Sequence, residues 1–393
     1  MRTLATLAAL TFAISSCGGS ASSDDASSMS EDLKLPTALV GSEFTQPLTK
    51  DSIRSLQTWI DDPTFEQKWT AMLTAPVEFF GGADSAYYAD LATLPARRLP
   101  GAETLCHGDP KLDNFGWTVV DGRGVFSDND FDDAGYCPVA ADALRYLVAT
   151  DLWFGDPKLD AAALDAYVAT VKKKDDAVAI DPGTEPNWGD TRTKGLAKDT
   201  KGDAIVLGGE VQAATAAEIA AVRDLAANDT RFADTVLDVT RDVRTDGGSA
   251  GFRRFWLLTE DGGGTRTIVE LKELGTPGTE FGRHSRSIDG GDRFDVLKPY
   301  WWDAKDPGDH FTVYLLGGRF VARDRMIRTN PKPAKMTPDQ ITNMVQAEAS
   351  LLALRHRKAW GKVKADALSS WLEASAATLT ARWRAAYTAA GGK

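Results

Sequence analysis

The chain has 393 residues, of which 43% are hydrophobic and 26% are charged, and its formal net charge is −11. These proportions are ordinary for a soluble globular protein, and the length suits one large domain or two lobes. The acidic balance argues against a nucleic-acid-binding protein, because contacts with phosphates require a basic face.

The N-terminus has the features of an export signal. After a charged start, residues 4–14 form an apolar run that is too short to span a bilayer. The letters ISSC that follow are typical of a bacterial lipobox, which predicts a signal peptide over residues 1–16 and a lipid on Cys17. Gly and Ser then favour a flexible tether over residues 17–47. We expect an extracytoplasmic lipoprotein, in the periplasm or on the cell surface, whose membrane contact is the lipid. The alternative is an ordinary secretory signal.

Helical patterning follows the tether. Ile53, Leu56, Trp59 and Ile60 form an apolar stripe within residues 48–75. Short helical pieces broken by glycines continue the pattern.

A short strand ending at Cys106 and a hairpin then interrupt the helical segments. The hairpin consists of two apolar runs around an Asp-Gly turn. Helices are predicted over residues 139–154 and 159–174, and residues 175–210 are expected to be loop. Residues 48–210 are therefore predicted to form a mainly helical lobe.

The pattern changes to strands in the second half. After an Ala-rich helix over residues 211–228, the runs TVLDVTRDV, GFRRFWLLTE and TRTIVELKEL predict an antiparallel meander. HFTVYLLGGRFVARDRMIR adds one or two strands, so residues 211–335 are predicted to be a sheet lobe. Thr337 and Pro338 suit the N-cap and first position of a helical tail. Residues 336–393 are expected to pack on the helical lobe.

The run CHGDPKLDNFG carries the most specific chemistry. Phosphoryl transfer requires a carboxylate near the acceptor hydroxyl, oxygen ligands for Mg²⁺ and a positive group on the phosphates. Asp109 and Asn114 have the spacing of a base and a metal ligand, and the hairpin would return Asp130 beside them. His107 is grouped with the catalytic residues, in the role of holding the loop.

Two alternatives remain for these acidic residues. Asp and Asn are common in plain turns because they hydrogen-bond their own backbone. A calcium loop would use Asp128, Asp130 and Asp132, but Asp133 and Val139 stand where an EF-hand has its glycine and its final acid.

A glycine-rich turn and a lysine supply the cationic half. In DGGSAG, glycines allow backbone N–H groups to approach phosphate oxygens, and Lys272 lies on the third strand of the meander. The alternative is an ordinary hairpin turn and a solvated lysine. Cys106 and Cys137 flank the acidic motifs, either as a disulfide or as two buried thiols.

These motifs together resemble the bacterial family called domain of unknown function 2252, a distant relative of protein kinases and aminoglycoside phosphotransferases. The resemblance rests on HGDPKLDNFG, on FSDNDFDDAGYCP with Asp142 and Arg145, and on GGSAGFRRFWLL with VELKEL. It implies an α+β, circularly permuted protein-kinase-like fold. In this fold the helical lobe carries the HGD and DFD motifs, and the sheet lobe carries the Gly-turn and the lysine.

The resemblance also implies roles for individual residues. Asp109 would be the base, Asn114 and Asp130 would bind Mg²⁺, and Asp142 would brace the loop. Lys272 would pair with the phosphates of ATP or another nucleotide. A phosphate loop would consist of Gly248, Ser249 and Gly251.

Three positions depart from the family pattern. Gly81 replaces an Arg, and Asp246 replaces the first Gly of the phosphate loop. Glu270 stands two residues before Lys272, where many kinases have a small residue against adenine. Glu280 is the candidate for the acid that pairs with the lysine.

The sequence thus predicts an exported phosphotransferase that moves a phosphoryl group from a nucleotide to an unknown hydroxyl-bearing acceptor. One alternative is a catalytically inactive envelope lipoprotein that binds a partner. The other is a metal-stabilised structural lipoprotein without nucleotide.

Overall fold

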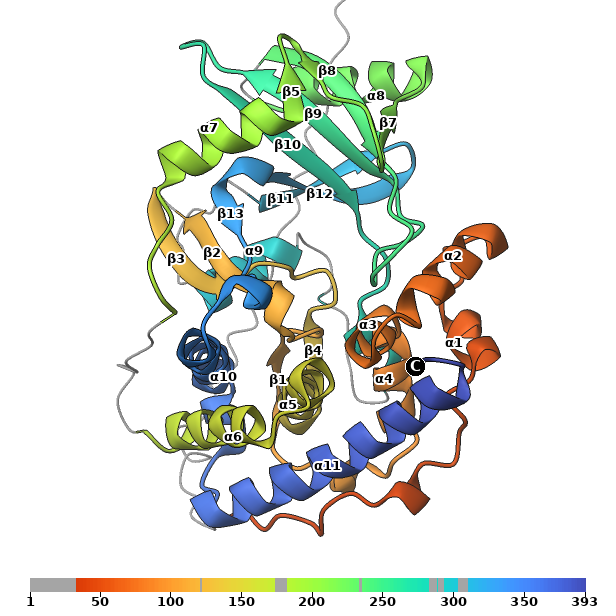
Figure 1. The fold of residues 1–393 in the computed structure, drawn as a ribbon, viewed down its shortest axis with the longest axis vertical. Helices are drawn as coiled ribbons and strands as arrows, with labels where there is room; N and C mark the ends of the chain where they lie inside the picture. The colour runs from red at the N-terminus through yellow and green to blue at the C-terminus, as the bar shows by residue number, and fades with distance from the viewer. Residues whose placement is uncertain are drawn as a thin grey trace, which may run out of the picture.

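A computed structural model describes residues 33–120, 122–173, 182–232, 235–282, 288, 293–302 and 310–393. The predicted signal peptide, Cys17 and the tether up to residue 32 lie outside the described residues. Figure 1 shows a twisted sheet at one end of the molecule and a group of helices at the other. The structure is a mixed α+β fold with antiparallel sheets.

The larger sheet has six strands in the order β11-β12-β10-β9-β8-β7. Its strands are β7 (Val211–Ala213), β8 (Thr235–Asp242), β9 (Arg254–Glu260), β10 (Arg266–Glu273), β11 (His310–Leu315) and β12 (Gly318–Asp324). The predicted meander is confirmed, because β8 pairs with β9 and β9 with β10, both antiparallel. The last predicted run forms the hairpin of β11 and β12.

Strand β9 is buried on both faces. Alternate side chains of a strand point to opposite sides, and here each set packs in a different apolar cluster. Phe255 and Leu257 belong to an apolar cluster under α8 (Ala216–Asn228). Trp256 and Leu258 belong to a second cluster on the other face, which includes Leu196 of α7 (Trp188–Asp199). The sheet is therefore covered by one helix on each face.

Two sequence predictions about this region are wrong. Residues 175–210 were expected to be loop, yet α7 forms there, followed by a small pair of strands, β5 (Thr200–Lys201) and β6 (Ala204–Ile205). Helix α7 has no buried residue and no apolar stripe, and it begins where the Asn187 side chain accepts from the Asp190 amide. The helix expected from residue 211 starts later, because Thr215 and Glu218 form a capping box after β7.

The helical end is built around α5 (Val139–Phe154), nearly all of which is buried. Helices α3 (Pro76–Gly82), α6 (Pro157–Lys172), α10 (Pro338–Trp360) and α11 (Ala365–Ala389) contact it. Helices α1 (Lys50–Leu56), α2 (Asp62–Met72) and α4 (Asp84–Ala92) extend this end toward the sheet. Thr337 is the N-cap of α10, as predicted, and Gly361 divides the tail into two helices. No helix in the described ranges is both long and apolar enough to cross a membrane.

Two small sheets connect the ends. Strand β1 (Glu103–Cys106) pairs with β4 (Gly135–Pro138), and a disulfide between Cys106 and Cys137 joins them, which excludes the free-thiol alternative. The predicted hairpin is β2 (Phe115–Val120) with β3 (Arg123–Asp128). Strand β13 (Arg328–Thr329) follows β12 in the chain and pairs with β2, so that β13, β2 and β3 form a three-stranded sheet. Helix α9 (Arg293–Trp302) contacts β3 and β11. The pairing of β13 with β2 therefore connects the large sheet to the helical end, and one cavity lies between them.

Candidate functional site

The loop after β1 is held rigidly by the first turn of α5. The Asp142 carboxylate accepts hydrogen bonds from the backbone amides of His107 (2.8 Å) and Gly108 (3.0 Å), which is the bracing role expected for it. Gly108 has a φ of 91°, and a Cβ there would lie 1.9 Å from the Asp133 carbonyl oxygen. Only glycine fits that position.

His107 is fully buried beneath the loop and does not line the cavity. Its Nε2 lies 2.8 Å from Asp128 Oδ1, and its Nδ1 accepts a hydrogen bond from the Asp109 amide at 3.3 Å. Burial alone would lower the pKa of His107, but the Asp128 carboxylate raises it to about 9. His107 is therefore a positioning residue that does not touch the space where a substrate would bind.

The raised pKa of His107 predicts a pH-dependent contribution to stability. Its pKa is about 9 in the folded protein and 6.5 when unperturbed, so the contribution is complete below pH 6.5 and is lost as the pH rises through 9. His107→Gln should lower the free energy of unfolding by roughly 1–3 kcal/mol at pH 6.5, with a smaller gap at pH 10. Urea unfolding of both proteins across this range would measure the gap.

Wild type and variant must be compared at each pH, because Lys68 titrates in the same pH range and also changes the stability of both proteins. Burial lowers the pKa of Lys68 to about 8, so its contribution increases as the pH rises above 8. A gap between wild type and His107→Gln that stays constant from pH 6.5 to 10 would show that His107 is neutral.

Asp109 reaches the cavity from the braced loop. The Arg145 Nε and Nη2 atoms lie 3.0 and 2.5 Å from Asp109 Oδ1. Burial alone would raise the pKa of Asp109, but Arg145 and Lys111 hold it below its usual value. The carboxylate is thus ionised and fixed in direction, which suits it to orient a hydroxyl group.

Asn114 is tied to Asp109 by its donor end. Its Nδ2 donates to the Asp109 carbonyl oxygen (2.8 Å) and to Asp109 Oδ2 (3.0 Å). The Asn114 Oδ1 atom is the end that remains for a cation, and amide oxygens are ligands for Mg²⁺ and Ca²⁺.

Asp130 and Asp132 meet Lys272 across the cavity. The Lys272 Nζ lies 3.2 Å from Asp130 Oδ2 and also contacts Asp132. Burial would raise the pKa of Asp130, but Lys272 and Arg323 hold it well below its usual value. Asp132 shows the opposite shift, because burial and the neighbouring Asp130 raise its pKa. Lys272 therefore lies between two carboxylates, and Arg323 Nη1 lies 3.7 Å from Asp130 Oδ1.

The buried atoms also fit a metal ion. Asp132 Oδ1 has no hydrogen-bond partner among the described residues. With Asn114 Oδ1 and Asp130, the donor set is the few oxygens that Mg²⁺ takes from a protein when water and phosphates complete its shell. The calcium-loop alternative fits less well, because Asp128 points away to His107. Within the described ranges, the group of three close metal-ligating residues is Cys106, Cys137 and Asp142, and there both sulfurs are in the disulfide.

The Gly-turn closes one side of the cavity. Gly248 and Ser249 line it, and the Gly248 carbonyl accepts from Lys68 Nζ at 3.2 Å. Gly251 does not line it, contrary to the prediction, because its α-carbon packs against Ile60, whose Cγ1 would lie 2.8 Å from an added Cβ. The turn is therefore anchored on the segment between α1 and α2.

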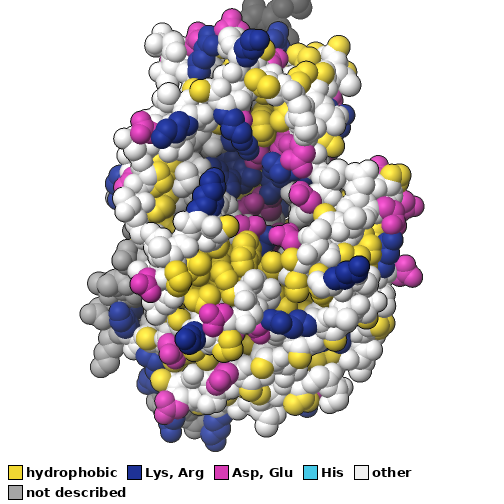
Figure 2. Space-filling model, viewed as in Figure 1, with side chains coloured by type: hydrophobic (Ala, Val, Ile, Leu, Met, Phe, Trp, Pro, Cys, Tyr) yellow, Lys and Arg dark blue, Asp and Glu magenta, His cyan; other side chains and the backbone are white. Residues whose placement is uncertain are grey.

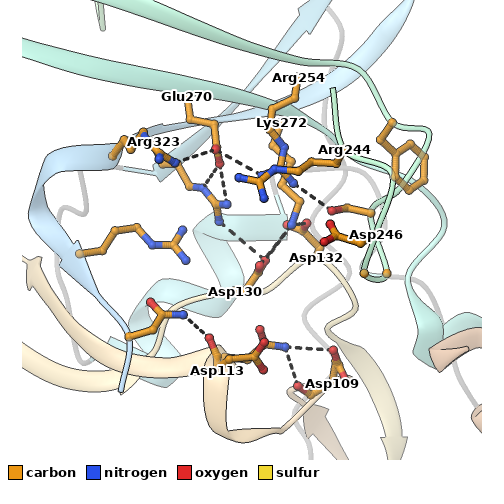
Figure 3. Close-up of a pocket in the computed structure, with 18 of the residues that line it drawn as sticks. Asp109, Asp113, Asp130, Asp132, Arg244, Asp246, Arg254, Glu270, Lys272 and Arg323 are labelled. Carbon is orange, nitrogen blue, oxygen red and sulfur yellow. Dashed lines mark hydrogen bonds and ion pairs between the residues drawn. The ribbon is translucent and has the colours of Figure 1, made fainter. Parts of the chain in front are cut away.

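These residues surround a single cavity of about 590 Å³. Figure 2 shows it as a hollow in which Lys, Arg, Asp and Glu side chains gather. In Figure 3, Asp109 and Asp113 lie on the helical side, Arg323 and Arg254 on the sheet side, and Asp130 between them. The acidic members on the helical side are Asp84, Asp109, Asp113, Asp130, Asp132 and Asp133.

The acidic half of the cavity lies within a segment that has relatives. Residues 61–174 match the family described as an uncharacterized protein conserved in bacteria (DUF2252). No curated protein and no solved structure matches the chain. The DUF2252 segment contains Asp109, Asn114 and Asp130, whereas the Gly-turn and Lys272 lie beyond it.

The sheet side lies outside the DUF2252 segment. It shows which residues pair with Lys272 and with Glu270. Glu280 is not the partner of Lys272, which pairs with Asp130 and Asp132. Glu270 turns to Arg323, whose Nη2 lies 2.6 Å from its Oε1. Glu270 therefore neutralises arginine and leaves Lys272 to the acidic motif.

Sequence reasoning missed the arginines of this side. Arg323, Arg325 and Arg328 follow one another at the end of β12 and all line the cavity. The available signal was the spacing in ARDRMIR, three like charges in six residues directly after an apolar strand. Such a run is usually a solvated surface. Here Arg323 pairs with Glu270 across β12 and β10, and the pairing of β13 with β2 places Arg328.

Proposed function

We propose that this protein is a Mg²⁺-dependent phosphotransferase that moves a phosphoryl group from a phosphate donor to a hydroxyl-bearing acceptor. The observation that supports this most directly is the 3.2 Å approach of Lys272 Nζ to Asp130, in a cavity that Asp109 also lines. Two segments 142 residues apart thus meet at one site. A nucleotide is the donor that the sequence resemblance implies, and the permuted kinase-like arrangement belongs to the same proposal.

Each group has a defined task in this scheme. Lys272 and the backbone of the Gly-turn hold phosphate oxygens. Asn114 and Asp130 would hold the Mg²⁺ ion, which when bound neutralises charge on the phosphates. Asp109 accepts the hydrogen bond of the acceptor hydroxyl and directs its oxygen toward phosphorus. Its low pKa is adequate, because phosphoryl transfer depends mainly on positioning and electrostatics.

Thermal stability measures donor binding without knowledge of the acceptor. In the presence of Mg²⁺, a donor at 100 times its dissociation constant should add about 2.7 kcal/mol to the free energy of unfolding. ATP, GTP and inorganic polyphosphates are the donors to compare. Asp130→Asn should abolish the Mg²⁺-dependent part of the gain, because it removes a charged metal ligand.

Asp62→Asn is the matched control, since the Asp62 side chain is 87% exposed on α2, away from the cavity. It should retain the full gain. If no donor stabilises the wild type with Mg²⁺, the phosphotransferase proposal fails.

A catalytically inactive binding protein is the second candidate. It is favoured by Asp246, which lines the cavity at the Gly-turn and would repel phosphate oxygens. Under this alternative, a ligand would bind but no phosphoryl group would move. Export and lipidation at Cys17 remain predictions, which a Cys17→Ser variant would test through loss of membrane association.

A further inference from the structure

The sheet side of the cavity carries five arginines around one buried glutamate. Glu270 Oε1 lies 2.6 Å from Arg323 Nη2, and Glu270 Oε2 lies 3.4 Å from Arg254 Nη1 and 3.9 Å from Arg325 Nη1. Arg244 and Arg328 complete the arginine cluster, and all five line the cavity. Figure 3 shows Arg323, Arg254 and Arg244 directed toward the space next to Lys272.

Four of the five arginines have carboxylate partners. Besides Glu270, Asp130 lies 3.7 Å from Arg323, Asp242 lies 3.8 Å from Arg254, and Asp199 lies 3.9 Å from Arg325. Arg244 is paired with Asp242 (3.1 Å) and Glu210 (3.0 Å). Arg328 has no carboxylate partner among the described residues; it donates to Asn129 Oδ1 at 3.1 Å, and its Nη1 is buried without a hydrogen-bond partner there. Burial and the nearby Arg323 lower the pKa of Arg328 to about 10. Arg328 is therefore the member of the arginine cluster whose charge is left for an anionic ligand to neutralise.

This part of the cavity offers little to a nucleobase. A purine site needs apolar faces on both sides of the ring. Among the described lining residues, the large apolar side chains are Trp59, Phe252 and Met326. Trp59 and Phe252 stack on each other at the Gly-turn, with ring centroids 5.1 Å apart. Glu270 with its arginines occupies the strand position beside Lys272, where the family resemblance would place adenine.

We propose that the phosphoryl donor is a linear inorganic polyphosphate, whose chain lies along the arginine cluster with its terminal phosphate at Lys272. This proposal rests on the phosphotransferase function. Every phosphate of such a chain carries a negative charge. The charges therefore follow one another along the chain and match a row of guanidinium groups. Arginine binds phosphate oxygens in pairs through its planar fork.

The reaction balances without a further reactant. The acceptor oxygen forms a bond to the terminal phosphorus, and the anhydride P–O bond to the next phosphate breaks. The acceptor proton leaves through Asp109. The shortened chain keeps the electron pair of the broken bond as an additional anionic oxygen, which Lys272 and the arginine cluster stabilise.

Calorimetric titration with Mg²⁺ present compares tripolyphosphate, a longer polyphosphate, ATP and sulfate. Tripolyphosphate and ATP carry the same number of phosphates, so the comparison isolates adenosine. We expect the longer chain to bind most tightly and ATP no more tightly than tripolyphosphate. Arg328→Gln and Arg244→Gln, both at half-buried positions, should each weaken polyphosphate binding about tenfold. Arg97→Gln, an exposed position on the helical end, should not.

Three results would overturn the proposal. ATP could bind at least tenfold more tightly than tripolyphosphate. Polyphosphate binding could survive both substitutions, or sulfate could compete at equal concentration. If the protein transfers phosphate from ATP and shows no preference for polyphosphate, polyphosphate is not the donor, but the phosphotransferase function stands. Polyphosphate that binds but is shortened neither by transfer to a range of hydroxyl-bearing acceptors nor by hydrolysis, as followed by ³¹P NMR, would reject phosphotransfer itself.

Discussion

Asp109→Asn should lower the rate of donor consumption by about 10²- to 10⁴-fold, the range typical for loss of a positioned acid–base group. The carboxylate is fixed by Arg145 and Asn114, and Asp109 is 7% exposed and lines the cavity. An amide at this position can no longer take the proton of the acceptor hydroxyl. The rate of phosphate transfer or release, measured with saturating donor and Mg²⁺, would give the effect.

Binding should survive in the same variant. Lys272 and Asp130 do not touch Asp109 in the described contacts, so the donor-induced rise in melting temperature is expected to remain. A rate within threefold of the wild type would remove Asp109 from the mechanism. Loss of donor binding together with rate would show that Asp109 holds the donor and not the acceptor.

The acidic half of the site was predictable because its determinants are local. The helix over residues 139–154 and the hairpin around Asp121-Gly122 follow from apolar periodicity and turn chemistry. Once the hairpin forms, Asp130 must return beside the loop of Asp109 and Asn114. The spacing alone therefore anticipates most of that geometry.

The basic half depends on long-range pairing, which one sequence does not reveal. Arg328 enters the cavity because β13 pairs with β2, some two hundred residues earlier in the chain. The partner of Lys272 was missed for the same reason: Glu280 is close in sequence, but Asp130 and Asp132 are close in space. Helix α7 escaped prediction because it lacks an apolar stripe and is stabilised by its cap and by the sheet.

Arg145→Met should destabilise the folded protein by about 3–5 kcal/mol, the cost of leaving one member of a buried ion pair alone. Arg145 is fully buried, and its guanidinium carbon lies 4.5 and 5.0 Å from the ring centroids of Phe80 and Tyr87. Methionine fills most of the same apolar space, so packing changes little. The main loss is the partner charge of Asp109. Urea unfolding at neutral pH would measure the difference.

The double variant Asp109→Asn/Arg145→Met separates stability from catalysis. It removes both charges, so its stability should recover most of the loss seen in Arg145→Met, while donor consumption stays as low as in Asp109→Asn. Acid pH provides a second check. Arg145 holds the pKa of Asp109 below its usual value, so the stabilisation from the pair is present above pH 3.8 and is lost as the pH falls through the folded pKa. The gap between wild type and Arg145→Met should therefore narrow in acid. A gap that is unchanged at low pH, with no recovery in the double variant, would mean that Arg145 acts through its contacts with Phe80 and Tyr87 and not through the carboxylate.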